Sequence, residues 1–226
     1  MQTLLLACVS FVASHFLLSG TPLRALLARL LGERLYLGFY SLLAIWLLIW
    51  MGLAYGAAPY VRLWPVSPAL LWVPLLVMPF ALLLIVGGYL ARNPTAVMQE
   101  PGGTDGKPAG IFAVTRHPIL WGFALWALAH IAARGDLASL VLFGSIAILS
   151  LGGTLALDAK KRRAWGERWA PFARRTSNLP FRAIADGRAR FRPGEFGVWR
   201  LLTAIALFAL LIWAHPRVLG VSALPF

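Results

Sequence analysis

Residues 69–90 read ALLWVPLLVMPFALLLIVGGYL, a run without any charged side chain. A helix of this length rises about 30 Å, the thickness of the hydrocarbon core of a bilayer. Lipid offers no partner for a free backbone N–H or C=O, so an apolar run this long predicts a transmembrane helix. Pro74 and Pro79 lie inside the run and predict a kink, because proline removes a helical hydrogen bond.

Five further apolar runs of similar length complete the pattern. They cover residues 3–19, 36–55, 111–133, 137–157 and 198–214. The sequence therefore predicts an all-α, polytopic transmembrane helix bundle of about six spans, forming a single membrane domain over residues 1–226. A signal peptide is the alternative for the first run, but its nearest basic residue, Arg24, follows the apolar stretch instead of preceding it.

The composition excludes the common soluble classes. Hydrophobic residues make up 60% of the chain and charged residues only 13%, which is not a soluble composition. The single cysteine, Cys8, excludes a disulfide scaffold and a site built from several thiolates.

The basic residues predict the orientation of the bundle. There are 21 Lys and Arg against 8 Asp and Glu, and all the basic residues but Arg62, Arg134 and Arg217 fall in the loops after the first, third and fifth spans. By the positive-inside rule, these loops face the cytoplasm. We therefore expect a multi-pass protein of a bacterial inner (cytoplasmic) membrane, with both termini outside.

Residues 158–196 form a long basic loop on the predicted cytoplasmic side. Trp165, Trp169 and Phe172 follow an i, i+4, i+7 spacing among basic residues, as in an amphipathic helix lying at the lipid headgroups. We expect the loop to bind anionic lipid and not nucleic acid. Asp158 is expected to pair with Lys161 and Arg162.

Small and polar residues predict three local features. Asp136, after Gly135, is placed to cap the helix that begins at residue 137. The pairs Gly87-Gly88 and Gly152-Gly153 predict close contacts between helices, because small side chains let membrane helices approach.

Three of the four histidines lie in predicted spans and His215 closes the sixth; an ionisable side chain at membrane depth is costly and usually functional. His15 and His117 fall near the cytoplasmic face, whereas His130 and His215 fall near the outer face. The thirteen residues between His117 and His130 correspond to about 20 Å of helical rise, so these two cannot bind one small ligand together. Two imidazoles from different helices are typical axial ligands of heme, and depth favours His15 with His117. A role in packing is the alternative for each histidine.

Several blocks of sequence, in this order, resemble one family. They are Ser14-His15 followed by Gly32-Glu33-Arg34; Val114-Thr115-Arg116-His117-Pro118 followed by Leu125-Trp126-Ala127-Leu128-Ala129-His130; and Trp165-Gly166-Glu167 followed by Leu179-Pro180-Phe181, with Ala214-His215-Pro216 at the close. The chain resembles the NnrU family, which includes plant zeta-carotene isomerase, over nearly its whole length.

The resemblance implies heme b as cofactor. It also implies either cis–trans isomerisation of a carotene, a hydrophobic small molecule, or a role in denitrification and nitric oxide metabolism. The heme ligands of the isomerase branch match His15 and His130, and His117 is then a pocket residue with a catalytic role. This second ligand differs from the one that depth favours, so His117 and His130 both stay open. The branch carries a cysteine three positions before the second histidine, where this chain has Ala127.

A second resemblance implies different chemistry. Arg116-His117-Pro118, followed by Trp165-Gly166 and Trp169, is similar to membrane methyltransferases that use S-adenosylmethionine. Those enzymes usually carry paired glutamates where this chain has Leu157-Asp158, so the match is incomplete. A non-enzymatic factor that assists heme assembly is a further alternative.

Overall fold

A computed structural model describes residues 1–91 and 110–224, and within them the chain is helical. An isolated bridge between Arg62 and Asp136 is the only strand-like pairing in these two ranges. The elements are α1 (Gln2–Gly20), α2 (Pro22–Leu31), α3 (Glu33–Gly56), α4 (Pro68–Leu90), α5 (Ile111–Val114), α6 (Pro118–Arg134), α7 (Leu137–Trp165), the 3-10 helix η1 (Gly166–Arg168), α8 (Ala170–Arg175), α9 (Arg182–Ala185), α10 (Pro193–Phe196) and α11 (Val198–Leu219).

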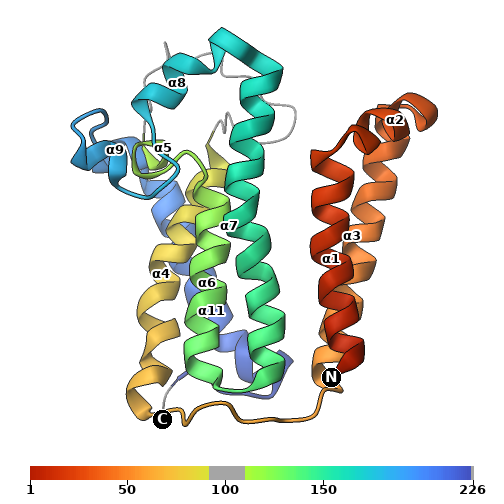
Figure 1. Cartoon of the computed structure of the whole chain (residues 1–226). Helices are drawn as coiled ribbons and strands as arrows, with labels where there is room; N and C mark the ends of the chain where they lie inside the picture. Colours follow the sequence, from red (N-terminus) through yellow and green to blue (C-terminus); the bar gives the residue numbers. More distant parts are fainter. Residues whose placement is uncertain (92–109, 225–226) are drawn as a thin grey trace.

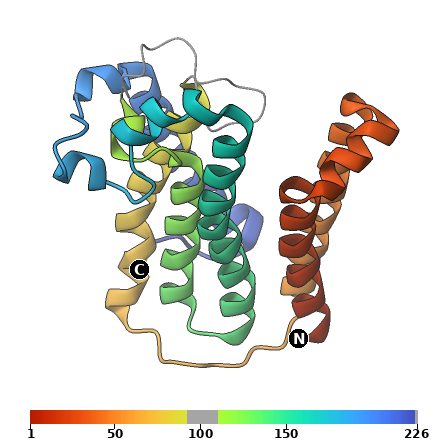
Figure 2. The same ribbon diagram turned by 45° about the horizontal axis from the view of Figure 1, so that its top comes forward.

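The long helices run roughly parallel to one axis in a bundle with two parts (Figure 1). In the larger part, α6 packs between α4 and α7, and α11 packs on α4. The hairpin of α1 and α3 packs against α7 through α1. Both termini lie at the bottom of Figure 1, whereas α8 and α9 lie at the other end, which we name the basic end. The same arrangement is visible in Figure 2.

Within the described residues, five helices are long and apolar enough to cross a membrane, namely α1, α3, α4, α7 and α11. They coincide with five of the six predicted spans, so the chain is a multi-pass membrane protein built as a helical bundle. The sixth apolar helix, α6, is shorter. Helix α4 continues through both Pro74 and Pro79.

The predicted fourth span, residues 111–133, begins too early. The structure divides it into α5 and α6, with Thr115 in an extended conformation at φ −155° and ψ 149° between them. Proline at the first turn of α6 is one cause, because Pro118 disfavours helical backbone at the preceding residue. Because the helix is broken here, backbone groups of residues 115–117 are free of helical hydrogen bonds and can bind a distant segment of the chain.

The predicted amphipathic helix is also interrupted. Helix α7 ends at Trp165, where Gly166 adopts φ 51°, and the chain resumes as η1 and α8. Trp169 and Phe172 are buried in the protein, with ring centroids 5.1 Å apart. Because these rings already pack against protein, the spacing that suggested a lipid-facing stripe produces a small core instead.

The turn between α6 and α7 confirms the predicted cap. Asp136 Oδ1 accepts a hydrogen bond from Ser139 N at 2.8 Å, and Oδ2 accepts one from Ser139 Oγ at 2.7 Å. The segment between α3 and α4 pairs with the same turn, since Leu63 N donates to Gly135 O and Leu137 N donates to Val61 O, both at 2.8 Å. This pairing fastens the two parts of the bundle at the end opposite the basic end.

Glycine permits the closest helix contacts, as predicted for the two glycine pairs. A Cβ on Gly88 would lie 2.6 Å from Ile119 Cγ1, and one on Gly152 would lie 2.9 Å from Phe16 Cζ. Gly122 is tighter still, because its Cβ would lie 2.5 Å from Ile85 Cγ1 and 2.7 Å from the backbone oxygen of Ala81. Helices α4 and α6 therefore touch backbone to backbone at Gly122.

We predict that Gly122→Ala destabilises the protein by about 1–3 kcal/mol, because the added methyl group must push α6 away from α4. Gly144→Ala on α7 is the control, since nothing lies within 4 Å of a Cβ there. Alanine favours helix over glycine, so the control is expected to keep its stability or gain up to about 1 kcal/mol. Thermal unfolding in detergent measures both, and equal melting temperatures would contradict the predicted contact.

Candidate functional site

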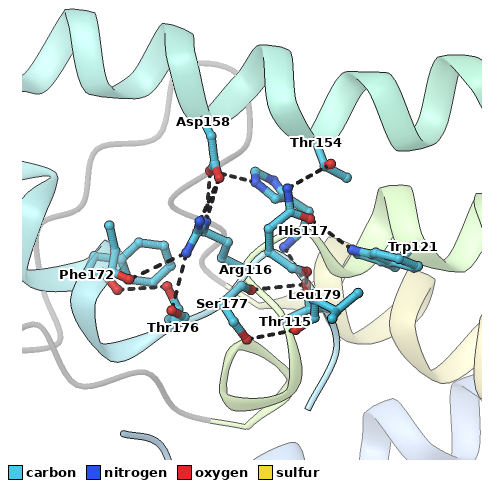
Figure 3. A network of polar contacts seen from close by, with 12 residues as sticks. Thr115, Arg116, His117, Trp121, Thr154, Asp158, Phe172, Thr176, Ser177 and Leu179 are labelled. Atoms are coloured by element: carbon cyan, nitrogen blue, oxygen red, sulfur yellow. Dashed lines mark hydrogen bonds and ion pairs between the residues drawn. The ribbon is translucent and has the colours of Figure 1, made fainter. Parts of the chain in front are cut away.

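A carboxylate on α7 holds together the polar network at the basic end (Figure 3). Asp158 accepts hydrogen bonds from Arg116 Nε, at 2.8 Å to Oδ1 and 3.0 Å to Oδ2, and from Arg116 Nη2, at 2.7 Å to Oδ2. The two side chains are only 14% and 15% exposed. A carboxylate in such a position needs an opposite charge and several donors, and the guanidinium supplies both.

His117 adds a further donor to the same carboxylate. Its Nε2 lies 2.8 Å from Asp158 Oδ1, and the imidazole side chain is fully buried. The residue lies just before α6 begins, and burial lowers its pKa although the Asp158 carboxylate opposes this. The ring is therefore neutral near pH 7, with its proton on Nε2 facing the carboxylate. Nδ1 is then an acceptor, and none of the described residues donates to it.

The residues before α6 are held by the segment that follows α8. Arg116 N donates to Ser177 O at 2.9 Å, and Arg116 Nη1 donates to Thr176 O at 3.3 Å. Thr115 Oγ1 donates to Asn178 O at 2.6 Å. These contacts explain the extended backbone at Thr115, because a continuous helix would direct the same groups to its own turns.

Asn178 connects the segment to both long helices. Its Nδ2 donates to Thr154 Oγ1 on α7 at 2.9 Å, and its Oδ1 accepts from Trp121 Nε1 on α6 at 3.2 Å. The side chain therefore satisfies two buried polar groups that lipid could not satisfy. Sequence reasoning missed Asn178 and Thr154, since nothing local to either residue indicates a partner.

Asp158 does not have the partners that were expected. The prediction of Lys161 and Arg162 is wrong, because the carboxylate faces α6 and binds Arg116 and His117. Lys161 lies instead over the ring of Trp165, 3.9 Å from its centroid. Both oxygens of Asp158 are engaged by protein donors, which suits a positioning role for the pair Asp158 and His117 at the start of α6.

His15 lies on α1, and its ring faces aromatic neighbours. Nδ1 donates to the carbonyl of Phe11 at 2.7 Å, one turn back along the helix. The ring centroid lies 4.3 Å from that of Phe11 and 5.6 Å from that of Tyr40 on α3. With Nδ1 bound to a carbonyl, Nε2 carries the lone pair, which is the form that binds metal.

His130 repeats this local arrangement on α6. Nδ1 donates to the carbonyl of Trp126 at 2.8 Å. The ring lies 5.4 Å from Trp126 and 5.0 Å from Phe143 on α7, measured between centroids. Tyr55 and Phe123 extend the group of rings through Phe143 and Trp126, so His130 lies in an aromatic cluster contributed by α3, α6 and α7.

The predicted histidine ligands lie apart. Each histidine can be placed by its level along α7. Phe16, the neighbour of His15, lies against Gly152 of α7, whereas the ring of His130 lies against Phe143. These two positions on α7 are nine residues apart, which corresponds to about 13 Å along the helix axis. Helix α7 also packs between α1 and α6. The two histidines thus lie on helices that α7 separates, and the predicted pairs of axial heme ligands, His15 with His130 and His15 with His117, stay predictions.

We predict that Asp158→Asn lowers the stability of the protein by about 2–3 kcal/mol, somewhat below the effect of breaking a fully buried pair. The amide cannot balance the charge of Arg116, and it offers one acceptor oxygen in place of two. Asp186→Asn is the matched control, because Asp186 binds Arg182 and Arg188 on the surface. Surface pairs contribute little, so thermal unfolding of the control should be unchanged. Equal losses in both variants would contradict a central role for Asp158.

Comparison with known proteins identifies relatives of the chain. It is 32% identical to 15-cis-zeta-carotene isomerase of Zea mays over 112 residues, which cover 47% of this chain and 30% of that protein. It is 33% identical to the Arabidopsis thaliana protein of the same name over 117 residues, 50% of this chain and 32% of the relative. Each alignment thus spans about a third of the relative's length. No solved structure matches. The model of the family described as NnrU protein matches residues 3–223, so the chain belongs to the NnrU family.

Proposed function

We propose that this protein is a membrane-embedded isomerase that converts a cis double bond of a carotene-like polyene to trans. The observation that carries the proposal is the similarity to two plant proteins named 15-cis-zeta-carotene isomerase, across about half of this chain. A C40 polyene dissolves in the lipid core, so an enzyme acting on it benefits from a site among membrane helices.

The aromatic cluster around His130 is the part of the structure that best suits such a substrate. Trp126 and Phe143 offer ring surfaces to a planar, apolar chain. The imidazole contacts both rings, whose own centroids lie 5.3 Å apart, and its Nδ1 is bound to a carbonyl. A polyene that lies on these rings would be next to His130 Nε2 and to a cofactor bound at that nitrogen.

We further propose that heme b binds through His130 or His15, each as a single axial ligand. The support is the shared geometry of the two rings, in which Nδ1 is held by the carbonyl one turn earlier. When bound, heme supplies an iron that acts as a Lewis acid or one-electron partner toward a polyene. The protein's own part is to fix the ring orientation and to keep water away with apolar helices.

We also propose that the basic end faces the cytoplasm of a bacterial inner membrane. Among the described residues, every Lys and Arg except Arg62, Arg134 and Arg217 lies in or next to the loops at that end, and the positive-inside rule assigns such loops to the cytoplasm. Both termini lie at the opposite end (Figure 1).

The isomerase proposal predicts conversion of 15-cis-zeta-carotene in vesicles that contain only this protein and lipid. Incubation in the dark, followed by chromatographic separation of the isomers, measures the conversion. His130→Ala should abolish most of it, because the ring lies in the proposed site. His215→Ala is the control, since His215 also binds a carbonyl through Nδ1, at 2.7 Å from Val221 O, but lies half-buried on α11 and outside the group of rings around His130. Absence of conversion by the wild type, with the fold intact and heme added, would contradict the proposal.

The heme proposal is tested by a reduced-minus-oxidised absorption spectrum of the purified protein. The signal should weaken in His130→Ala or in His15→Ala and persist in His117→Ala, because His117 Nε2 is bound to Asp158. Loss of the signal in both His15→Ala and His130→Ala would indicate a shared iron and a different packing of α1. A heme signal without isomerisation would favour the denitrification or assembly roles. A colourless protein that binds S-adenosylmethionine would favour the methyltransferase.

A further inference from the structure

The segment between α8 and α10 forms a small lobe at the side of the basic end. Figure 1 shows α9 beside the upper end of α4 and level with α5, outside the ring of long helices, and Figure 2 shows the same displacement. Contacts between α9 and α5 attach the lobe to the bundle. Because α4 is long and apolar enough to cross a membrane and α9 lies beside its end, the lobe lies at the level where a membrane surface is expected.

Phe181 in this lobe has an unusual conformation. Its φ of 63° makes it the one residue other than glycine with positive φ in the described ranges. Such a backbone is strained for a bulky side chain and persists only where the surroundings impose it. Here Phe181 N donates to Val114 O of α5 at 2.8 Å, and Ala185 N donates to Phe181 O at 2.9 Å.

The strain does not serve to bury the ring. Phe181 is 63% exposed, and Leu179, two residues earlier, is 56% exposed. The other side of the lobe is packed, since Ala183 and Ala189 form a buried cluster with Ala113 of α5. Two large apolar side chains are therefore exposed on the surface of the lobe, and the backbone at one of them, Phe181, is strained.

Arginine surrounds these apolar side chains. The lobe and its margins carry six exposed arginines against two carboxylates, Asp186 and Glu195; the arginines are Arg174, Arg175, Arg182, Arg188, Arg190 and Arg192. Asp186 is already shared by Arg182 at 3.1 Å and Arg188 at 2.8 Å. An excess of positive charge thus remains next to an exposed apolar pair, the combination that binds an anionic lipid surface.

We propose that the lobe of residues 176–192 is a membrane-surface anchor, in which Phe181 and Leu179 enter the boundary between headgroups and acyl chains of anionic phospholipid. The arginines bind the phosphate groups around them. This anchor replaces the one expected from Trp165, Trp169 and Phe172, two of which are buried inside the protein. The proposal is independent of the reaction that the protein catalyses.

The test uses the full chain in vesicles, with a nitroxide label on Phe181→Cys in a Cys8→Ala background. Collision with oxygen, which dissolves in lipid, is compared with collision with a water-soluble nickel complex. We expect a higher oxygen-to-nickel ratio at residue 181 than at Glu167→Cys, an exposed position on η1. The ratio at residue 181 should rise when phosphatidylcholine is replaced by phosphatidylglycerol, and fall again at high salt.

Several outcomes would overturn the anchor. Equal ratios at residues 181 and 167 would place Phe181 in water. Protection from both reagents, in detergent as well as in vesicles, would show that protein covers the ring. Equal oxygen-to-nickel ratios in phosphatidylcholine and phosphatidylglycerol would show that the arginines do not bind anionic lipid. Leu179→Cys provides a second position if the first label disturbs the strained turn, and it should give the same order of ratios.

Discussion

The buried carboxylate of Asp158 is the constraint on which the basic end depends. A charge removed from water at the end of a membrane helix must be paired and hydrogen-bonded, and Arg116 and His117 do both. They can reach it only if the chain before α6 is extended, which sets the start of α6. Arg116 also binds the carbonyl of Thr176, so the same charge orders the segment after α8.

The histidines serve the structure in two different ways. His117 has Nε2 on a carboxylate and is fully buried, which suits a residue that fixes the chain at the start of α6. His15 and His130 bind only the carbonyl one turn earlier through Nδ1, and both lie among aromatic rings. The second arrangement leaves a lone pair directed away from the parent helix, which is what a ligand in the membrane requires.

Close helix packing and backbone hydrogen bonds stabilise different parts of the bundle. Gly88 and Gly122 let α4 and α6 approach until their backbones nearly touch, and α6 carries His130 and begins directly after His117. Hydrogen bonds between Val61, Leu63 and the turn at Gly135 fasten the opposite end. The lobe with Phe181 is attached to the pair of α4 and α6 through α5, which contacts α9 as well as both of these helices.

The sequence by itself determined the positions of five of the six apolar helices, the cap at Asp136 and the close contacts at glycine pairs. Each depends on neighbouring residues, because apolar length, capping and small side chains act locally. Tertiary structure decided the burial of Trp169 and Phe172 and the partners of Asp158, and together with Pro118 it decided the break between α5 and α6. Those features join residues as far apart as 42 and 60 positions in the chain, through Arg116 with Asp158 and Arg116 with Thr176. The physical reason is that a buried charge takes the best donors in space, which local spacing does not reveal.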